Sequence, residues 1–339
     1  MILKPTPFII AEMSGNHNQS LDRAIAIVDA AADAGAHAIK LQTYTADTMT
    51  LPGVHRIIDE DSIWKGKELY DLYNEAYTPW EWHKPLFEHA KKRGIMAFSS
   101  PFDATAVDFL ETLDVPMYKI ASFENTDWPL LIKVAQTGKP VIMSTGASTL
   151  SDIDDAVRVL RDYGCTDLTL LKCTSTYPAS PENTNLATIP VMKEIFGCAV
   201  GLSDHTMGIG VSVAAIAFGA TVIEKHLTIS RAEGGVDSTF SMEPHELAAL
   251  VEEANRAYKA MGSVFFGILP AERKSVKHKR SIYVRKDIKA GEKFTVDNLQ
   301  VIRPADGLLP RYYNEVLGRT ASKELKAGTP LTWDLLLPN

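Results

Sequence analysis

The feature that most restricts the fold is an alternation that repeats eight times over residues 8–262. Each repeat starts with a short run of apolar and β-branched residues, ends that run in polar residues, and continues with a helical pattern. The expected strands are residues 8–13, 37–44, 95–100, 117–122, 141–146, 168–175, 199–204 and 221–227. Amphipathic helical segments lie between them, such as residues 20–35, 104–113, 151–164 and 244–262. Eight strand–helix repeats predict a closed (β/α)8 TIM barrel over residues 1–262.

A doubly wound open sheet is the competing architecture. No GxGxxG motif follows the first expected strand, which weakens the dinucleotide-binding form of that fold. Residues 45–80 form a long insertion between the second strand and its helix. Insertions at this point lie on the C-terminal face of a barrel, so we expect the segment to form part of the site.

The alternation stops after residue 262. Residues 263–279 contain a basic cluster without a clear period, which predicts a linker. Residues 280–339 contain two KAG turns, at 289–291 and 326–328, each followed by short mixed segments. This pattern predicts a small, mostly β second domain.

The bulk composition excludes several classes of protein. Hydrophobic residues make up 45% and charged residues 23% of the chain, which is typical of a soluble globular protein. The net charge of −7 argues against nucleic acid as the main partner, and no apolar stretch reaches the ~18 residues of a membrane span. Cys165, Cys173 and Cys198 form no CxxC pair, so we expect free thiols and a cytoplasmic location.

Ionisable residues lie at or near the ends of the expected strands. They are Glu12, Lys40, Lys119, Lys172, Asp204, His205, Glu224, Lys225 and His226. The C-terminal ends of all strands in a parallel barrel open at one mouth, so these residues are expected to converge. A charged group buried there is costly unless it is paired or bound to a metal.

His205 and His226 end the two last expected strands, which are neighbours around the barrel. Two imidazoles at adjacent strand ends can share one divalent ion, completed by oxygen ligands from water and substrate. An open shell without cysteine favours Mn²⁺ or Mg²⁺ over structural Zn²⁺. The alternative is a pair of hydrogen-bonded structural histidines.

Lys40 and Lys119 predict an anion clamp, since a phosphate group is bound by ammonium charge and many short donors. The hydroxyl groups expected to assist them are those of Ser99, Ser100, Ser122, Ser144, Thr145 and Ser203. Glu12 is either a general base, a group that stabilises positive charge, or a helix cap. Lys225 alternates with Glu224 and His226, so it should point to the opposite face of its strand and form a structural ion pair.

The motifs AEMSGNHN, KLQTY, FSSPFD, YKIAS, STG, GLSDHT and EKHLT follow one another in this order. In this order the set resembles the sialic acid synthase family over essentially the whole chain. The resemblance implies a (β/α)8 barrel with a C-terminal antifreeze-like (SAF) domain. It also implies an enzyme that condenses phosphoenolpyruvate with an acetamido sugar to make a nonulosonic acid. The segments AEMSGNHNQSLDRA, KLQTYTADTMTL and LYNEAYTPWEWH look most like the members that make pseudaminic acid from 2,4-diacetamido-2,4,6-trideoxy-altrose.

The resemblance assigns roles to individual residues. His205 and His226 match the metal ligands, usually of manganese, with Mg²⁺ or Co²⁺ as alternatives, and Glu12 matches the catalytic glutamate. The residues that match the phosphoenolpyruvate site are Lys40, Ser100, Lys119, Ser122, Ser144 and Ser203. Tyr177 and Asp237 match sugar-binding positions. Arg303 matches an arginine that the SAF domain inserts into the barrel of the partner subunit, which implies a domain-swapped homodimer.

One departure from the family pattern concerns the sugar. Ser175 stands where the members that make sialic acid carry an asparagine, which favours a differently substituted sugar. N-acetylneuraminate and legionaminate synthases of the same family remain alternatives. A metal-dependent aldolase on the same barrel and a non-catalytic carbohydrate-binding protein are the alternatives outside it.

Overall fold

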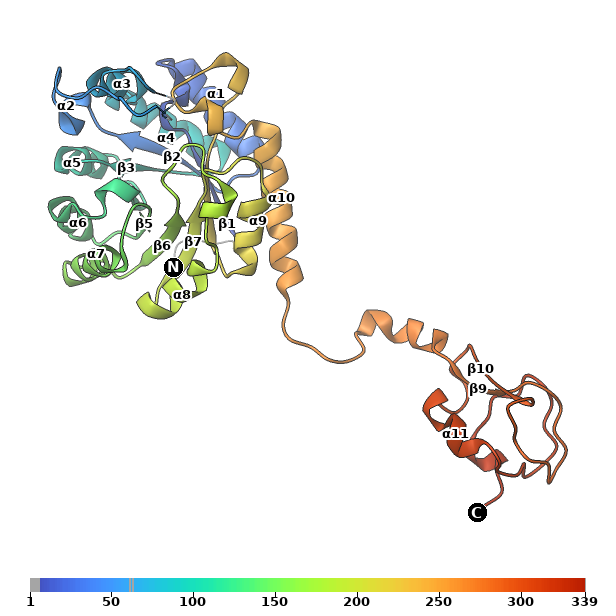
Figure 1. The fold of residues 1–339 in the computed structure, drawn as a ribbon. Helices are drawn as coiled ribbons and strands as arrows, with labels where there is room; N and C mark the ends of the chain where they lie inside the picture. The colour runs from blue at the N-terminus through green and yellow to red at the C-terminus, as the bar shows by residue number, and fades with distance from the viewer. Residues whose placement is uncertain (1–6, 61, 63, 339) are drawn as a thin grey trace. The chain divides into compact units, whose positions relative to one another are not determined.

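The computed structural model of the protein describes residues 7–60, 62 and 64–338. The chain divides into two compact units, Met1–Gly262 and Ser263–Asn339 (Figure 1).

The first unit is a closed barrel of eight parallel strands, in which each strand pairs with the next and β8 pairs with β1 (Figure 1). The strands are β1 (Phe8–Glu12), β2 (Ala38–Thr43), β3 (Met96–Pro101), β4 (Tyr118–Ile120), β5 (Val141–Ser144), β6 (Leu168–Cys173), β7 (Ala199–Ser203) and β8 (Val222–His226). This topology confirms the (β/α)8 barrel predicted from the eight repeats.

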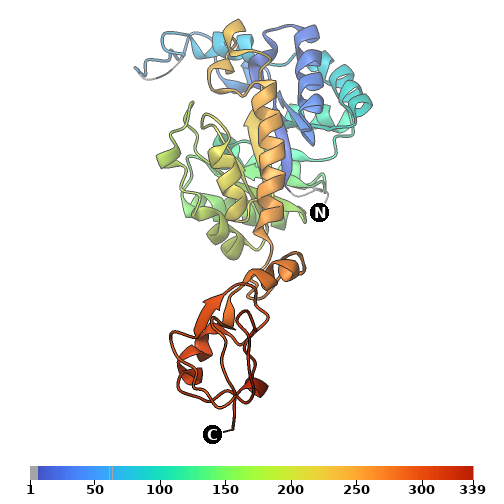
Figure 2. The ribbon, with the colours of Figure 1, turned by 90° about the vertical axis from the view of Figure 1, so that its right-hand side faces the viewer.

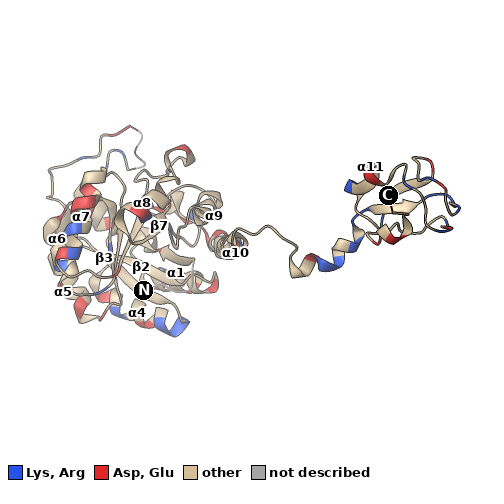
Figure 3. Cartoon of the chain, turned by 90° about the horizontal axis from the view of Figure 1, so that it is seen from below, with Lys and Arg blue, Asp and Glu red and all other residues tan. Residues whose placement is uncertain are grey.

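A helix follows each strand on the outside of the barrel. These helices are α1 (Leu21–Asp33), α4 (Trp80–Arg93), α5 (Ala104–Thr112), α6 (Trp128–Ala135), α7 (Leu150–Asp162), α8 (Thr188–Phe196), α9 (Gly210–Ala217) and α10 (Pro244–Met261). Figure 2 shows α10 running along the outside of the barrel, where it packs against α9. Charged residues of both signs lie on α4 and α7 (Figure 3), whereas the apolar faces of these helices are buried against the strands.

The insertion after β2 contains two short helices, α2 (Ala46–Met49) and α3 (Leu69–Ala76). The outer helices α4 and α8 end at glycines. Gly94 and Gly197 close α4 and α8 in the left-handed region, with φ of 78° and 58°. A residue without a Cβ atom adopts this conformation at little cost, which explains why these helices stop there.

Both faces of the strands are buried. One apolar layer lies between strands and helices, and a smaller one fills the barrel interior with residues such as Phe8, Phe98, Met117 and Val222. These interior residues precede the polar strand ends in the sequence. The barrel interior is therefore packed with apolar side chains, and the C-terminal ends of the strands carry the polar site, as in parallel barrels generally.

The second unit has its own core. The strands β9 (Ser281–Val284) and β10 (Leu299–Ile302) form an antiparallel pair, and α11 (Tyr313–Val316) is a short helix. Buried residues of this core include Ile282, Phe294 and Leu331. Within the expected linker, Pro270–His278 forms the 3₁₀ helix η6, a segment to which the sequence pattern assigned no regular structure. In the described part of the chain no helix combines the length and the apolar character needed to cross a membrane.

Gly201 in β7 provides a test of the barrel packing. A Cβ atom at this position would lie 2.3 Å from the carbonyl oxygen of Val222 and 2.7 Å from Cδ2 of Leu171. Because a backbone atom must move to admit it, Gly201→Ala should lower the free energy of unfolding by about 3 kcal/mol, at the upper end of overpacking costs. Gly210→Ala is the matched control, since nothing lies within 4 Å of its Cβ position. Urea denaturation of both variants measures the difference, and equal stability of the two would contradict the packing described.

Candidate active site

Four charged side chains from four strands meet at the C-terminal end of the barrel. They are Glu12 on β1, Lys40 on β2, Lys119 on β4 and Glu224 on β8, and each is at most 4% exposed. Lys40 Nζ lies 2.5 Å from Glu12 Oε2 and 3.8 Å from Glu224 Oε2. Lys119 Nζ lies 3.4 Å from Glu224 Oε1. We call these four residues the charge network.

Burial and pairing shift the pKa values of the charge network in opposite directions. Burial raises the pKa of Glu12 and lowers that of Lys119. Burial also acts to raise the pKa of Glu224, but Lys119 and Lys40 outweigh it and hold that pKa below its usual value. With two carboxyl groups and two amino groups, the charge network has equal numbers of acidic and basic groups.

The expected phosphate-binding hydroxyl groups lie around this network. Ser100 Oγ accepts a hydrogen bond from Lys40 Nζ at 3.2 Å, and Ser203 Oγ donates one to Glu224 Oε1 at 3.0 Å. Ser122 Oγ accepts from the backbone N–H of Gly146 at 3.1 Å. Ser144 Oγ is buried, and no residue in the described part of the chain forms a hydrogen bond with it. Such a hydroxyl group at a polar mouth is available to a ligand or a water molecule.

One hydroxyl group expected in the clamp, that of Ser99, lies elsewhere, and for it the expectation was wrong. Ser99 Oγ lies 2.6 Å from Thr43 Oγ1, which in turn contacts His83 on α4 at 2.8 Å. Thr145 Oγ1 donates to the carbonyl oxygen of Leu171 at 3.0 Å, and its place in the clamp stays a prediction. Successive side chains of a strand point to opposite faces, so Ser99 points outward where Ser100 points inward.

His205 and His226 lie beside each other at the ends of β7 and β8, with ring centroids 5.3 Å apart. His205 Nδ1 lies 3.1 Å from the carbonyl oxygen of Thr174. A carbonyl oxygen only accepts, so Nδ1 carries the proton and the lone pair of Nε2 is free to bind a metal. His226 Nδ1 is buried and has no hydrogen-bond partner among the described residues, and burial holds its pKa well below the usual value.

These features are compatible with a divalent metal ion shared by the two imidazoles, and its binding stays a prediction. Both imidazoles offer a nitrogen lone pair, and the carbonyl oxygen behind His205 orients its ring as supporting residues of metal sites do. Among the described residues no group of three or more His, Cys, Asp or Glu side chains could hold an ion. An ion held by these two imidazoles would leave most of its coordination shell to water and substrate.

Asp204 and Lys225 both point away from the barrel mouth, on the face opposite to that of Glu224 and His226. Lys225 Nζ lies 3.1 Å from Asp204 Oδ2 and donates to the carbonyl oxygens of Thr206 and Gly208. Asp204 Oδ1 accepts from the backbone N–H of Thr206 at 2.8 Å. This confirms the structural ion pair expected for Lys225, and it fixes the turn that carries His205.

Cys173 is a site residue that the sequence pattern did not single out. Its Sγ lies 3.9 Å from His205 Nδ1 and 3.6 Å from Ser175 Oγ. Burial acts to raise the pKa of Cys173, but His205 and the nearby hydroxyl groups lower it to about 7. All three cysteines are free thiols, as expected. The position of Cys173 at the end of β6 is the feature of the sequence that could have identified it as a site residue.

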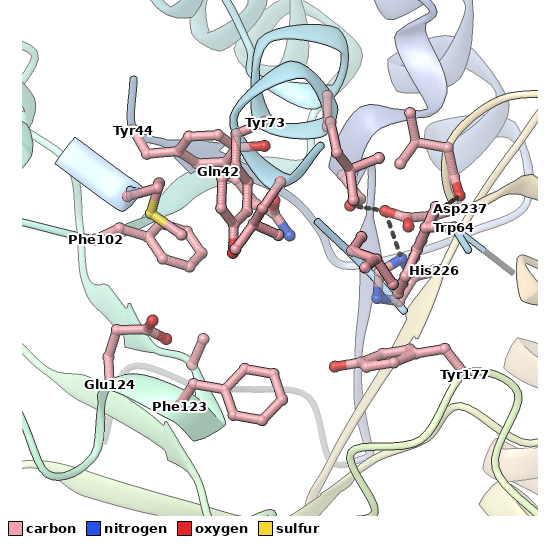
Figure 4. Close-up of a pocket in the computed structure, with 18 residues that line it drawn as sticks. Gln42, Tyr44, Trp64, Tyr73, Phe102, Phe123, Glu124, Tyr177, His226 and Asp237 are labelled. Carbon is pink, nitrogen blue, oxygen red and sulfur yellow. Dashed lines mark hydrogen bonds and ion pairs between the residues drawn. The ribbon is translucent and has the colours of Figure 1, made fainter. Parts of the chain in front are cut away.

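A cavity of about 360 Å³ opens beside these residues (Figure 4). Tyr177, His226 and Asp237 line it, and the ring of Tyr177 lies 4.6 Å from that of His205. Asp237 Oδ2 accepts a hydrogen bond from Ser14 Oγ and lies 4.0 Å from His226 Nδ1. Burial raises the pKa of Asp237. Two of the three expected sugar-binding residues thus share one cavity with a histidine of the pair.

The insertion after β2 forms much of the cavity wall, which confirms its expected place in the site. Trp64 and Tyr73 come from it, and Trp64 Nε1 donates to the carbonyl oxygen of Val236 at 3.0 Å. Glu124, from the 3₁₀ helix η2 (Ser122–Glu124), also lines the cavity. Sequence reasoning did not identify Trp64 or Glu124, because the insertion and this loop have no hydrophobic period.

Arg303 follows β10 in the second unit and is exposed. Its insertion into the barrel of a partner subunit stays a prediction.

Comparisons with known proteins agree with this architecture. The NeuB family model matches residues 27–265, and the SAF domain matches residues 279–337. The pseudaminic acid synthase of Helicobacter pylori is 43% identical over 335 residues, which cover 98% of each chain. The N,N'-diacetyllegionaminic acid synthase of Campylobacter jejuni is 37% identical over 322 residues, covering 94% of this chain and 96% of that protein.

A solved structure gives the same result. The N-acetylneuraminic acid (sialic acid) synthetase of Leptospira borgpetersenii, in complex with citrate, is similar to this chain with a TM-score of 0.72 and 34% identity. The match covers 80% of this chain and 90% of that chain. Together these matches confirm the family resemblance and the C-terminal SAF domain.

The Lys225–Asp204 pair provides a test of what holds the His205 turn. Lys225→Met leaves the Asp204 carboxylate buried without its cation, so it should lower the free energy of unfolding by about 3–5 kcal/mol. Lys326→Met is the matched control: Lys326 also lies 3.1 Å from an aspartate, Asp287, but on an exposed surface where such pairs contribute little. Urea denaturation should show a large loss for the first variant and almost none for the second. Similar stability of the two variants would contradict the structural role of the buried pair.

Proposed function

We propose that this chain, which belongs to the NeuB family, is a pseudaminic acid synthase. It would condense phosphoenolpyruvate with 2,4-diacetamido-2,4,6-trideoxy-altrose and release phosphate by cleavage of a C–O bond. The relatives named above are synthases of nonulosonic acids. The observation that carries the proposal is the buried charge network beside the histidine pair, because two lysines and the unpartnered hydroxyl group of Ser144 at one mouth fit an anionic substrate.

Phosphoenolpyruvate would bind at the charge network. Its carboxylate and phosphate groups would meet Lys40 and Lys119, since hydrogen bonds between ions are the strong ones. The hydroxyl groups of Ser100, Ser122, Ser144 and Ser203 would supply short donors. Ser144 Oγ, which has no partner among the described residues, would find one in the phosphate group.

His205 and His226 would hold a divalent metal ion, with Mn²⁺ the first choice and Mg²⁺ or Co²⁺ as alternatives. When bound, the ion would polarise the aldehyde oxygen of the open-chain sugar as a Lewis acid. The protein fixes the ring of His205 through the carbonyl oxygen of Thr174. His226 stays neutral because burial depresses its pKa.

The new C–C bond forms between C3 of phosphoenolpyruvate and the aldehyde carbon of the sugar. Positive charge then develops at C2, and the Glu12 carboxylate would stabilise it and take a proton from the water that adds there. The aldehyde oxygen becomes a hydroxyl group by taking up the proton that the added water gives to Glu12. The tetrahedral intermediate then loses phosphate by cleavage of the C2–O bond to the phosphate group, and the proton of its C2 hydroxyl group leaves with the phosphate as the keto group forms. Lys40 and Lys119 hold the anion throughout, so the two substrates react from fixed positions.

Tyr177 and Asp237 would bind the sugar in the cavity that they line. Arg303 would complete the site from a partner subunit in a domain-swapped homodimer, since a guanidinium group offers several fixed donors to sugar oxygens.

Phosphate release tests the proposed function. The enzyme with Mn²⁺ should release one phosphate per sugar consumed when both phosphoenolpyruvate and 2,4-diacetamido-2,4,6-trideoxy-altrose are present, and none when either is absent.

The same assay tests the metal and Glu12. Chelation by EDTA should abolish the reaction, and Glu12→Gln should reduce kcat by roughly 100-fold or more with KM little changed. Glu111→Gln, a glutamate on the outer helix α5, is the control.

The other outcomes separate the alternatives. Preferred use of N-acetylmannosamine or of the legionaminic acid precursor would indicate a different synthase of the family. Cleavage or condensation of a sugar without phosphoenolpyruvate would indicate an aldolase. Sugar binding without phosphate release under any condition would contradict an enzymatic function.

A further inference from the structure

The cavity has an aromatic recess at one end, away from His226 and Asp237 (Figure 4). Tyr44, Tyr73 and Phe102 form it, and they come from the ends of β2 and β3 and from α3. Tyr44 contacts Tyr73 and Phe102 edge to face, with ring centroids 5.8 Å and 5.2 Å apart. Trp80 Nε1 holds the backbone of Tyr44 through a 3.1 Å hydrogen bond. The recess is therefore built from packed rings rather than from mobile side chains.

Glu124 adds a polar group to this end of the cavity. Figure 4 shows its carboxyl group directed into the cavity, on the same side as Phe102. Its Oε2 atom is buried, and no donor among the described residues reaches it. A buried acceptor without a donor is costly, and an N–H group of a ligand can supply Glu124 with a hydrogen bond that no described residue supplies.

A ligand group that suits this end carries an N–H donor next to a small apolar end. An acetamido group has both, because its amide N–H adjoins a methyl group. A hydroxyl group could donate to Glu124, but it would leave the aromatic recess filled with water. The chemistry of the recess thus favours an acetamido substituent over a hydroxyl substituent at the same carbon.

We propose that this recess binds the acetamido group at C4 of the sugar, the one farther from the reacting aldehyde. Tyr44, Tyr73 and Phe102 enclose its methyl group, and Glu124 accepts its N–H. The inference rests on the proposed function and adds to it the residues that select diacetamido sugars. The aldehyde end of the same sugar lies toward His226 and Asp237, at the opposite end of the cavity.

The test compares two sugars that differ only at C4. One is 2,4-diacetamido-2,4,6-trideoxy-altrose, and the other is 2-acetamido-2,6-dideoxy-altrose, which has a hydroxyl group there. The wild-type enzyme should favour the diacetamido sugar in kcat/KM by roughly 10- to 200-fold, the range of such pocket contacts. Phosphate release measures kcat/KM for both sugars.

Variants of the recess should reduce this preference selectively. Phe102→Ala and Glu124→Leu should lower kcat/KM for the diacetamido sugar by about 10-fold or more, and change that for the C4-hydroxyl sugar by less than about 3-fold. Glu124→Gln keeps an acceptor oxygen and should recover part of the loss. If Phe102→Ala does not fold, Phe102→Leu replaces it in the test, because leucine keeps much of the apolar volume. Phe218→Ala, an exposed aromatic residue after α9, is the control.

The outcomes separate the subsite from the proposed function. If the wild-type enzyme turns over both sugars and the variants lose activity equally on both, the subsite is wrong and the function stands. If the wild-type enzyme turns over neither sugar, the proposed function is wrong and the subsite with it. An unchanged KM for phosphoenolpyruvate in the variants should accompany the selective loss.

Discussion

The site depends on keeping four charged side chains out of water. Glu12, Lys40, Lys119 and Glu224 are almost fully buried, and each would be costly there without the others. They come from β1, β2, β4 and β8, so only the closed barrel brings them together. The apolar side chains buried below them and between strands and helices stabilise the fold and offset this cost. The site therefore exists only in the closed barrel.

Strand alternation then divides the work between two faces. On β8, Glu224 and His226 face the mouth while Lys225 points outward to Asp204. On β7 and the turn after it, Ser203 reaches Glu224, Asp204 anchors the turn, and His205 joins His226. The residues that would perform chemistry and those that hold them in place therefore alternate along the same segments. The mutation of one face is expected to affect function, and that of the other to affect stability.

The strands, the fold and the converging charges could be predicted because buried parallel strands leave a strong local pattern. The same alternation predicted the outward ion pair of Lys225, and applied to Ser99 it would have excluded that residue from the clamp. Trp64 and Glu124 could not be predicted in this way. Their positions depend on contacts of an insertion and a loop that have no period, such as the bond from Trp64 to the carbonyl oxygen of Val236. The proposed place of Arg303 in a partner's site would depend on assembly, which the local sequence pattern does not encode.

The central claim is that the charge network exists to bind phosphoenolpyruvate, and calorimetric titration with phosphoenolpyruvate tests it most directly. Lys119→Met removes one of the two network cations, so the account predicts binding at least about 10-fold weaker than in the wild-type protein. Lys172→Met is the matched control: Lys172 lies on β6, and its Nζ donates to the carbonyl oxygen of Cys173 outside the network. It should bind phosphoenolpyruvate as the wild-type protein does. Equal affinity of all three folded proteins, or no binding to the wild-type protein, would contradict the account.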